Sequence, residues 1–120
     1  MAEAAPATAA DEIDAANRTF APYGFSFYDL AACSPRTDKT RGSCARAAAA
    51  LLASPLLLAE LCHTHGLPVK ALAKQSGVSS KLIERHRRYL IAAVLLLSGD
   101  YPMLSGYLQT LRKEIALCVQ

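Results

Sequence analysis

The sequence has no tryptophan, and its few cysteines follow no metal-binding or disulfide-framework spacing. The cysteines are Cys33, Cys44, Cys62 and Cys118. No two of them form a CxxC pair, so we expect free thiols in a reducing cytoplasm. No apolar run reaches the roughly 18–20 residues that a membrane span needs. The alanine-rich, acidic N-terminus lacks the basic segment that opens a secretory signal. We therefore expect a cytoplasmic protein with no membrane insertion.

Patterns typical of catalysis and metal binding are also absent. Asp29, Asp38 and Glu60 form no recognisable acid–base pair, and there is no nucleophile elbow or phosphate-binding loop. The run Cys62-His63-Thr64-His65 offers potential zinc ligands, but structural zinc takes four ligands and no partner pair is evident. We interpret this run as a helix end with one buried cysteine and exposed histidines. We expect no enzyme activity, no cofactor, no metal and no small-molecule substrate.

The positive charge is unevenly distributed along the chain. A length of 120 residues with 52% hydrophobic residues indicates a single domain with a substantial core, and the net charge is only +3. Residues 1–32 carry five acids and one base, whereas residues 70–88 carry six bases and one acid. A basic segment of this kind is typical of a protein with a polyanionic partner. A charged helix face that is only solvated is the alternative.

Capping residues, prolines and apolar periodicity predict an all-α fold, a small bundle of about seven helices that contains a helix-turn-helix. Residues 1–10 are alanine-rich and are predicted to form a disordered linker or tail, with the domain spanning 11–120. We see no convincing strand and no internal repeat. Ser26 and Asp29 predict a capping box, Ser54 an N-cap before Pro55, and Gly66 the C-cap of the helix that starts there. The predicted helices are Asp11–Ala21, a short helix after Ser26 through Ala32, Thr40–Ala53, Pro55–His65, the two helices of the turn motif, of which the second is Ser80–Leu97, and a last helix from a cap at Asp100 to Leu117.

The segment from Val69 to Arg88 fits a helix-turn-helix. Gly77 suits a turn whose backbone needs a positive φ. Ala73 is small enough for two helices to cross closely, and Val78 and Ile83 are predicted to fill the space between them. Ser79 and Ser80 are candidate caps for the second helix.

The exposed face of the second helix predicts the DNA contacts. Arginine pairs bidentately with guanine and glutamate accepts from cytosine, so this face is expected to read bases. Arg85 and Arg88 are three positions apart in the predicted helix, so their side chains are expected to project side by side. Other cations are expected to contact phosphate, which adds affinity without sequence information. The base-reading residues are Ser80, Lys81, Glu84, Arg85 and Arg88, and the phosphate contacts are Lys70, Lys74 and Arg87. Arg36, Lys39 and Arg41 are candidates for further phosphate contacts beside the turn motif. For Arg41, binding to helix-end carbonyls or to an acidic partner is the alternative.

Three segments resemble one family in the same order. KLIERHRRYLIAAVLLLSGDYPMLSGYL is similar to a recurring "ERNRKYIIA…SGDYPYLKEYL" segment, and YGFSFYDLAACSPRTDKTR is similar to "fGISFxDLVxxSPKHxxTR". The Leu67-Pro68 pair before the turn motif also matches. These segments span about Tyr23 to Leu108. The chain thus resembles the C-terminal domain of sigma-I type (SigI) RNA polymerase sigma factors.

The resemblance implies a promoter-binding function. In this family the N-terminal domain binds core RNA polymerase, and the C-terminal domain reads the minus-35 element of double-stranded promoter DNA. The resemblance also implies regulation by a membrane-anchored anti-sigma factor, whose N-terminal domain binds the C-terminal domain of the sigma factor.

This sequence departs from the family pattern at several points. His86 stands in place of asparagine and Leu82 in place of threonine. No polymerase-binding domain precedes the matched region, so we expect an excised domain, a truncated product or a stand-alone relative that does not initiate transcription by itself. The alternative function is a protein-interaction module that titrates the anti-sigma factor.

Overall fold

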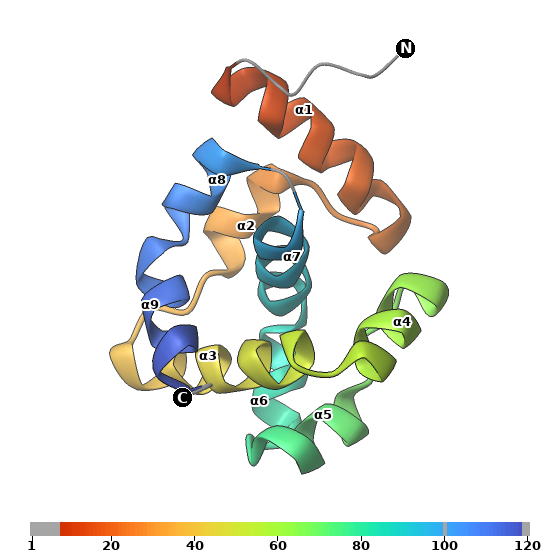
Figure 1. The fold of residues 1–120 in the computed structure, drawn as a ribbon, viewed down its shortest axis with the longest axis vertical. Helices are drawn as coiled ribbons and strands as arrows, with labels where there is room; N and C mark the ends of the chain where they lie inside the picture. Colours follow the sequence, from red (N-terminus) through yellow and green to blue (C-terminus); the bar gives the residue numbers. More distant parts are fainter. Residues whose placement is uncertain (1–7, 100, 119–120) are drawn as a thin grey trace.

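The computed structural model describes residues 8–99 and 101–118, and all regular structure in this range is helical. The absence of strands from these residues confirms the all-α class. The helices pack around α7, with α1 at one end of the molecule and α5 and α6 at the other (Figure 1). In chain order they are α1 (Ala9–Phe20), the 3-10 turn η1 (Ala21–Tyr23), α2 (Phe27–Cys33), α3 (Asp38–Leu52), α4 (Pro55–Thr64), α5 (Val69–Ser76), α6 (Ser80–Arg85), α7 (Arg87–Ser98), α8 (Pro102–Tyr107) and α9 (Gln109–Cys118).

Helix α7 forms the centre of the core. Leu90, Val94 and Leu96 are fully buried, and so are the alanines between them. A helix that is apolar on all sides is stable only when neighbours cover every face. Helices α1, α2, α3, α6 and α8 all contact α7 and supply that cover.

Helix α3 has small side chains where α5, α7 and α9 pack against it. Cys44, Ala45, Ala47 and Ala48 have no exposed surface. Because these side chains are short, α5, α7 and α9 can all approach α3 closely, and each of the three contacts it. Thr37 caps this helix by accepting a hydrogen bond from the Thr40 N–H at 3.2 Å.

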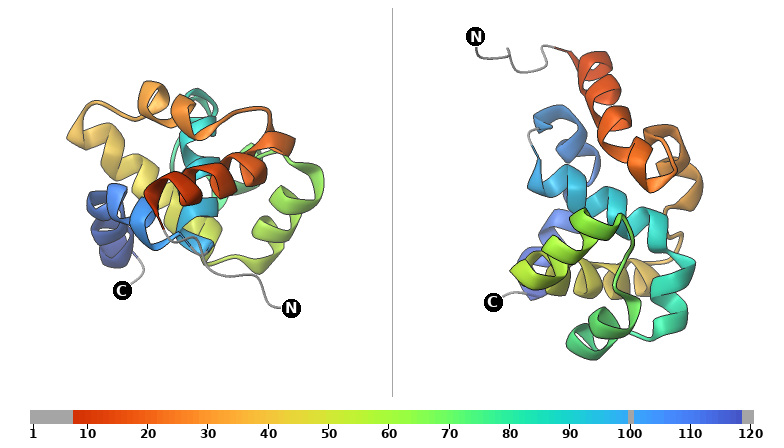
Figure 2. Two further views of the ribbon diagram at one scale, coloured as in Figure 1. Left: turned by 90° about the horizontal axis from the view of Figure 1, so that it is seen from above. Right: turned by 90° about the vertical axis from the view of Figure 1, so that its right-hand side faces the viewer.

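The helix predicted from Ser80 to Leu97 is interrupted at His86, and this part of the prediction is wrong. His86 has φ −106° and ψ 24°, outside the helical region, and it separates α6 from α7. The chain changes direction between α6 and α7 (Figures 1 and 2). The hydrogen bonding nevertheless continues, because the His86 N–H donates to the Leu82 carbonyl and the Leu90 N–H donates to the His86 carbonyl, both at 3.0 Å. Local periodicity does not reveal the bend, since α6 stays at the surface while α7 enters the core.

The predicted last helix is also divided. Helix α8 ends at Tyr107 and α9 begins at Gln109, so the expectation of about seven helices becomes nine α-helices within the described residues. The predicted cap at Asp100 lies outside the described residues. Ala9 and Ala10, which the sequence interpretation placed in the tail, belong to α1, and residues 1–7 lie outside the described range.

Helix α1 is fastened to the start of α8 by a buried carboxylate. Glu12 has no exposed surface, and its Oε1 accepts hydrogen bonds from the backbone N–H groups of Met103 at 3.0 Å and Leu104 at 2.9 Å. A second link joins Thr19 Oγ1 and the Tyr101 hydroxyl at 2.7 Å. A carboxylate suits this position, because the first N–H groups of a helix have no partner within the helix.

The cysteines Cys33, Cys44 and Cys62 are free thiols, as expected, and the side chain of Cys118 lies outside the described part. Cys62 is exposed, so the prediction that it is buried is wrong; Leu61 takes the buried position at this end of α4.

No single helix in the described residues is long and apolar enough to cross a membrane. Helices α3 and α4 together have the required length and apolar character, but the pair is bent by 94°.

Candidate nucleic-acid interface

The turn between α5 and α6 has the geometry that the sequence predicts. Gly77 has φ +75°, and its N–H donates to the Ala73 carbonyl at 3.0 Å. Val78 is buried beside it with 4% of its surface exposed. Ser79 Oγ then accepts the Leu82 N–H at 3.2 Å and caps α6. Local chemistry therefore determines both where α5 ends and where α6 begins.

Helix α6 has one buried side and one exposed side. Ile83 is fully buried. The other face presents Ser80, Lys81, Glu84 and Arg85, all of which are exposed. The right-hand view of Figure 2 shows this short helix at the edge of the molecule. Four of the five predicted base-reading residues therefore share one accessible helix.

Arg88, the fifth predicted base reader, is exposed but belongs to α7. The expectation that Arg85 and Arg88 project side by side from one helix is wrong, because α6 ends at Arg85. The bend at His86 directs the two side chains into different surroundings, and they line different cavities.

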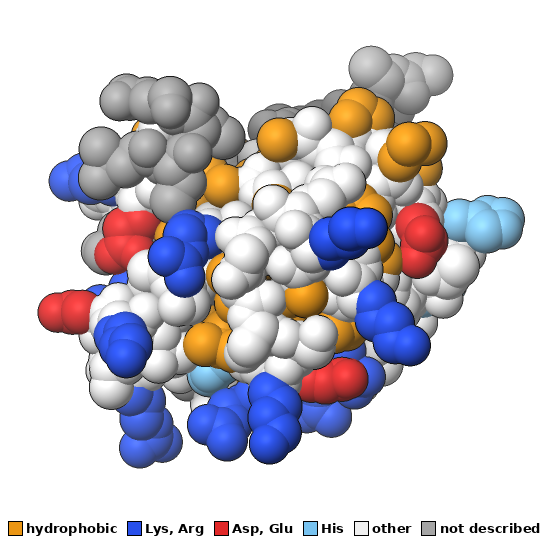
Figure 3. Space-filling model, turned by 90° about the horizontal axis from the view of Figure 1, so that it is seen from below, with side chains coloured by type: hydrophobic (Ala, Val, Ile, Leu, Met, Phe, Trp, Pro, Cys, Tyr) orange, Lys and Arg blue, Asp and Glu red, His pale blue; other side chains and the backbone are white. Residues whose placement is uncertain are grey.

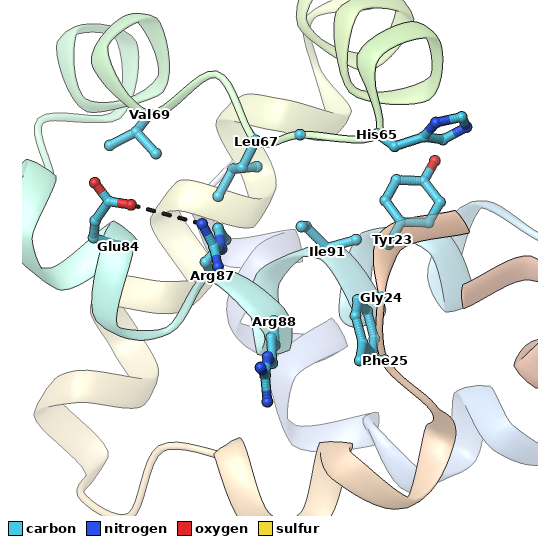
Figure 4. A pocket seen from close by; sticks show the side chains of 11 residues that line it. Tyr23, Gly24, Phe25, His65, Leu67, Val69, Glu84, Arg87, Arg88 and Ile91 are labelled. Atoms are coloured by element: carbon cyan, nitrogen blue, oxygen red, sulfur yellow. Dashed lines mark ion pairs between the residues drawn. The ribbon is translucent and has the colours of Figure 1, made fainter. Parts of the chain in front are cut away.

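Arg88 lines a cavity of about 450 Å³ between η1, the α4–α5 connection and the start of α7 (Figure 4). Aromatic rings form one wall, where Tyr23 packs edge-on against His65 with ring centroids 5.1 Å apart. Burial raises the pKa of the Tyr23 hydroxyl above its ordinary value, and the neighbouring Cys62 raises it further. The remaining wall includes Phe25 and Ile91.

Glu84 and Arg87 are partners across the bend. Their Oε1 and Nη1 atoms lie 4.0 Å apart, the side chains are 62% and 53% exposed, and the dashed line in Figure 4 joins them. Arg87 points toward Glu84, whereas Arg88 points away from it (Figure 4). An exposed pair at this separation contributes about 0–1 kcal/mol, so either side chain can leave it for a stronger partner.

Arg85 lines a second cavity of about 370 Å³ where the α2–α3 connection meets the bend. Cys33, Arg36, Thr37 and His86 also line it. Arg36 is one of the further candidates for a phosphate contact, and only the tertiary fold brings it to the same cavity as Arg85.

The predicted phosphate contacts Lys70 and Lys74 are exposed on α5. Lys70 lines a shallow cavity of about 490 Å³ with Glu60, Ser80 and Glu84, so acidic groups offset part of its charge. Lys and Arg side chains gather along one edge of the face that Figure 3 shows, with few acidic side chains among them.

The remaining candidates have structural explanations. Within the described residues, no group of three His, Cys, Asp or Glu side chains is arranged to hold a metal ion. His65 ends α4 in the left-handed conformation with φ 57°, a role that the sequence interpretation gave to Gly66. Asp38 pairs with Arg41 at 2.8 Å, and Asp29 accepts the Ser26 N–H at 2.9 Å as the predicted capping box requires.

These features define a small all-α protein whose exposed, basic helix follows a glycine turn. No protein-family model matches the chain. Over 87 residues it is 39% identical to RNA polymerase sigma factor SigI of Bacillus subtilis (strain 168), which covers 72% of this chain and 35% of that protein. Over 108 residues it is 30% identical to RNA polymerase sigma factor SigI6 of Acetivibrio thermocellus, and the match covers 89% of this chain and 43% of that protein. Over 97 residues it is 29% identical to RNA polymerase sigma factor SigI2 of the same organism, and the match covers 81% of this chain and 37% of that protein.

The chain therefore carries a SigI-type sigma-factor domain, as the three matching segments indicated. It spans less than half the length of these curated relatives.

Proposed function

We propose that this domain recognises promoter DNA at the minus-35 element, with α5 and α6 as a helix-turn-helix and α6 as its reading helix. It would act as the C-terminal domain of a sigma factor in transcription initiation, with RNA polymerase and promoter DNA as partners, by binding and not by catalysis. The observation that carries the proposal is the two-sided α6, which Ile83 anchors and whose exposed face presents Lys81, Glu84 and Arg85.

The roles of the side chains follow from their chemistry. Ser80 and Lys81 lie in the first turn of α6, the part that a helix-turn-helix presents to base edges. Arg85 pairs with guanine and Glu84 accepts from cytosine once it leaves Arg87. Arg88 stays in the proposed interface, but it would contribute less to base recognition than Arg85, because it belongs to α7.

Phosphate contacts supply the remaining affinity. Lys70 and Lys74 on α5 and Arg87 at the start of α7 flank α6, so they would contact the backbone on either side of the groove. Such contacts make binding depend on salt without selecting a sequence.

Binding of the 120-residue chain to duplexes with and without the minus-35 element tests the proposal. Arg85→Ala should weaken binding to the element by about 1–3 kcal/mol and relax the base preference, whereas Lys70→Ala should mainly reduce the salt dependence. Arg18→Ala is the matched control, because it removes an exposed arginine from α1 at the other end of the molecule. Equal affinity of the unaltered chain for both duplexes would reject the assignment.

A further inference from the structure

The cavity beside Arg85 is rich in hydrogen-bond donors and contains no acid. The full set of side chains that line it is Ala32, Cys33, Ser34, Arg36, Thr37, Thr40, Arg85 and His86. Two of these are permanently cationic and none is an Asp or Glu. Arg36 comes from the α2–α3 connection and Arg85 from the end of α6, so the cavity joins a segment outside the turn motif to the reading helix.

Within residues 8–99 and 101–118, the two arginines have no internal counterion. Among the residues that the structure describes, neither Arg36 nor Arg85 forms an ion pair. The nearby acids are engaged elsewhere, since Asp38 pairs with Arg41 at 2.8 Å and Asp29 accepts the Ser26 N–H. Two guanidinium groups around one hollow repel each other, and an anion between them removes that repulsion.

A third arginine adds to the positive field. Burial raises the pKa of the Cys33 thiol above its ordinary value, and the charge of Arg88 opposes this rise. Arg88 therefore lies close enough to act on a group that lines the cavity. The carboxylate of Asp29 acts on the same thiol in the opposite direction. His86 supplies a further donor at the bend.

We propose that this cavity binds one backbone phosphate of the DNA that α6 reads, with the guanidinium of Arg36 as its principal ligand. This inference rests on the proposed function and extends the interface beyond α5 and α6. Arginine suits the role because its planar group donates two parallel hydrogen bonds to phosphate oxygens. A phosphate held here would lie at the C-terminal end of α6 and determine how far that helix advances along the groove.

Methylphosphonate substitution tests the proposal, because it removes the charge of one phosphate at a time. A scan of both strands should reveal one position at which the unaltered chain loses about 10-fold in affinity, as expected for a charge-assisted contact. Arg36→Ala should lose a similar factor on the natural duplex, reduce the salt slope by about 1 and keep the base preference. At that one methylphosphonate position, Arg36→Ala should show no additional loss.

Two variants complete the experiment. Lys39→Ala removes a neighbouring exposed cation that does not line the cavity, so it should still lose affinity at that position. Arg36→Lys should keep the salt slope but lose part of the affinity, because lysine lacks the bidentate geometry. Circular dichroism and thermal unfolding should show every variant folded, since Arg36 and Lys39 are both exposed.

The outcomes separate this inference from the function on which it rests. If the unaltered chain does not distinguish the minus-35 duplex from a scrambled one, the proposed function fails. If it does distinguish them but Arg36→Ala loses affinity at every methylphosphonate position as the unaltered chain does, the phosphate site is rejected and the function stands.

Discussion

The carboxylate of Glu12 accepts a hydrogen bond from the backbone N–H of Leu104 at 2.9 Å, although the two residues are 92 positions apart in the chain. Glu12 thereby caps α8 from a different helix. Because Glu12 is fully buried and Leu104 is 5% exposed, water does not replace this bond in the folded protein. The contact therefore connects α1 to α8, the helix that follows the core helix α7.

We expect Glu12→Ala to lower the free energy of unfolding by about 2–4 kcal/mol, because the N–H groups of Met103 and Leu104 lose their acceptor and a buried space opens. Urea denaturation measures this loss. Glu12→Gln keeps one carbonyl oxygen and should lose less, and the exposed Asp14→Ala should change stability by no more than about 0.5 kcal/mol. An unaltered urea midpoint in Glu12→Ala would contradict this role.

Gly77→Ala should destabilise the protein by about 1–2 kcal/mol through backbone strain alone. Gly77 has φ +75°, and a Cβ atom there meets nothing within 4 Å, so no steric clash contributes. Gly106→Ala is the matched control, since that glycine lies in α8 with open space around it and no positive φ. The control should be neutral or slightly stabilising in thermal unfolding, because alanine favours helix. Equal effects of the two substitutions would show that the left-handed turn is not strained.

Ser79→Ala should remove the cap of α6 and lower stability by about 1 kcal/mol. The Leu82 N–H, which now donates to Ser79 Oγ at 3.2 Å, would lose its side-chain acceptor. Ser80→Ala removes an exposed hydroxyl from the first position of α6 and should leave the unfolding midpoint unchanged. If Ser80→Ala destabilises the protein as much as Ser79→Ala, the cap assignment is wrong.

The Cys44 thiol should resist alkylation in the folded protein, whereas the exposed Cys62 should react. Burial raises the pKa of Cys44 from 9.0 to about 11, and the thiolate is the reactive form. Mass spectrometry after brief treatment with iodoacetamide at pH 8 measures both sites. Labelling of Cys44 as fast as Cys62 would show that Cys44 is accessible.

The same raised pKa predicts a dependence of stability on pH. The folded state disfavours the Cys44 thiolate, so this contribution to stability is fully present below pH 9.0 and is lost as the pH rises toward about 11. Urea midpoints of the unaltered chain and of Cys44→Ala, compared across this range, isolate the contribution from other groups that titrate there. A difference between the two that does not change with pH would contradict the prediction.

Several local features were predictable because their causes lie within a few residues. The capping box of Ser26 and Asp29, the start of α4 at Pro55 after the Ser54 cap and the turn at Gly77 all occur where the sequence indicates. Each depends on a hydrogen bond or a φ angle set by near neighbours. The exposed residues of α6 were predictable in the same way, since Ile83 identifies the buried side.

The bend at His86 was not predictable from periodicity. Ile83 and Leu90 keep a helical spacing of seven positions across the polar residues 84–88, and the backbone hydrogen bonds on either side of His86 are retained. Only the need to place α6 at the surface and α7 in the core distinguishes the two helices. That division places Arg88 on α7 instead of α6, and it leaves Arg85 lining the same cavity as Arg36.

The sequence by itself determined the helical class, the glycine turn and the basic, outward face of the helix that follows it, because local hydrogen bonding and amphipathic spacing act over three or four residues. The tertiary structure alone decided which distant side chains meet. Glu12 bonds to α8, and Arg36 and Arg85 line one cavity, only after the helices have packed around α7. Such contacts depend on how whole helices bury their apolar faces against one another, and no spacing within a single segment specifies them.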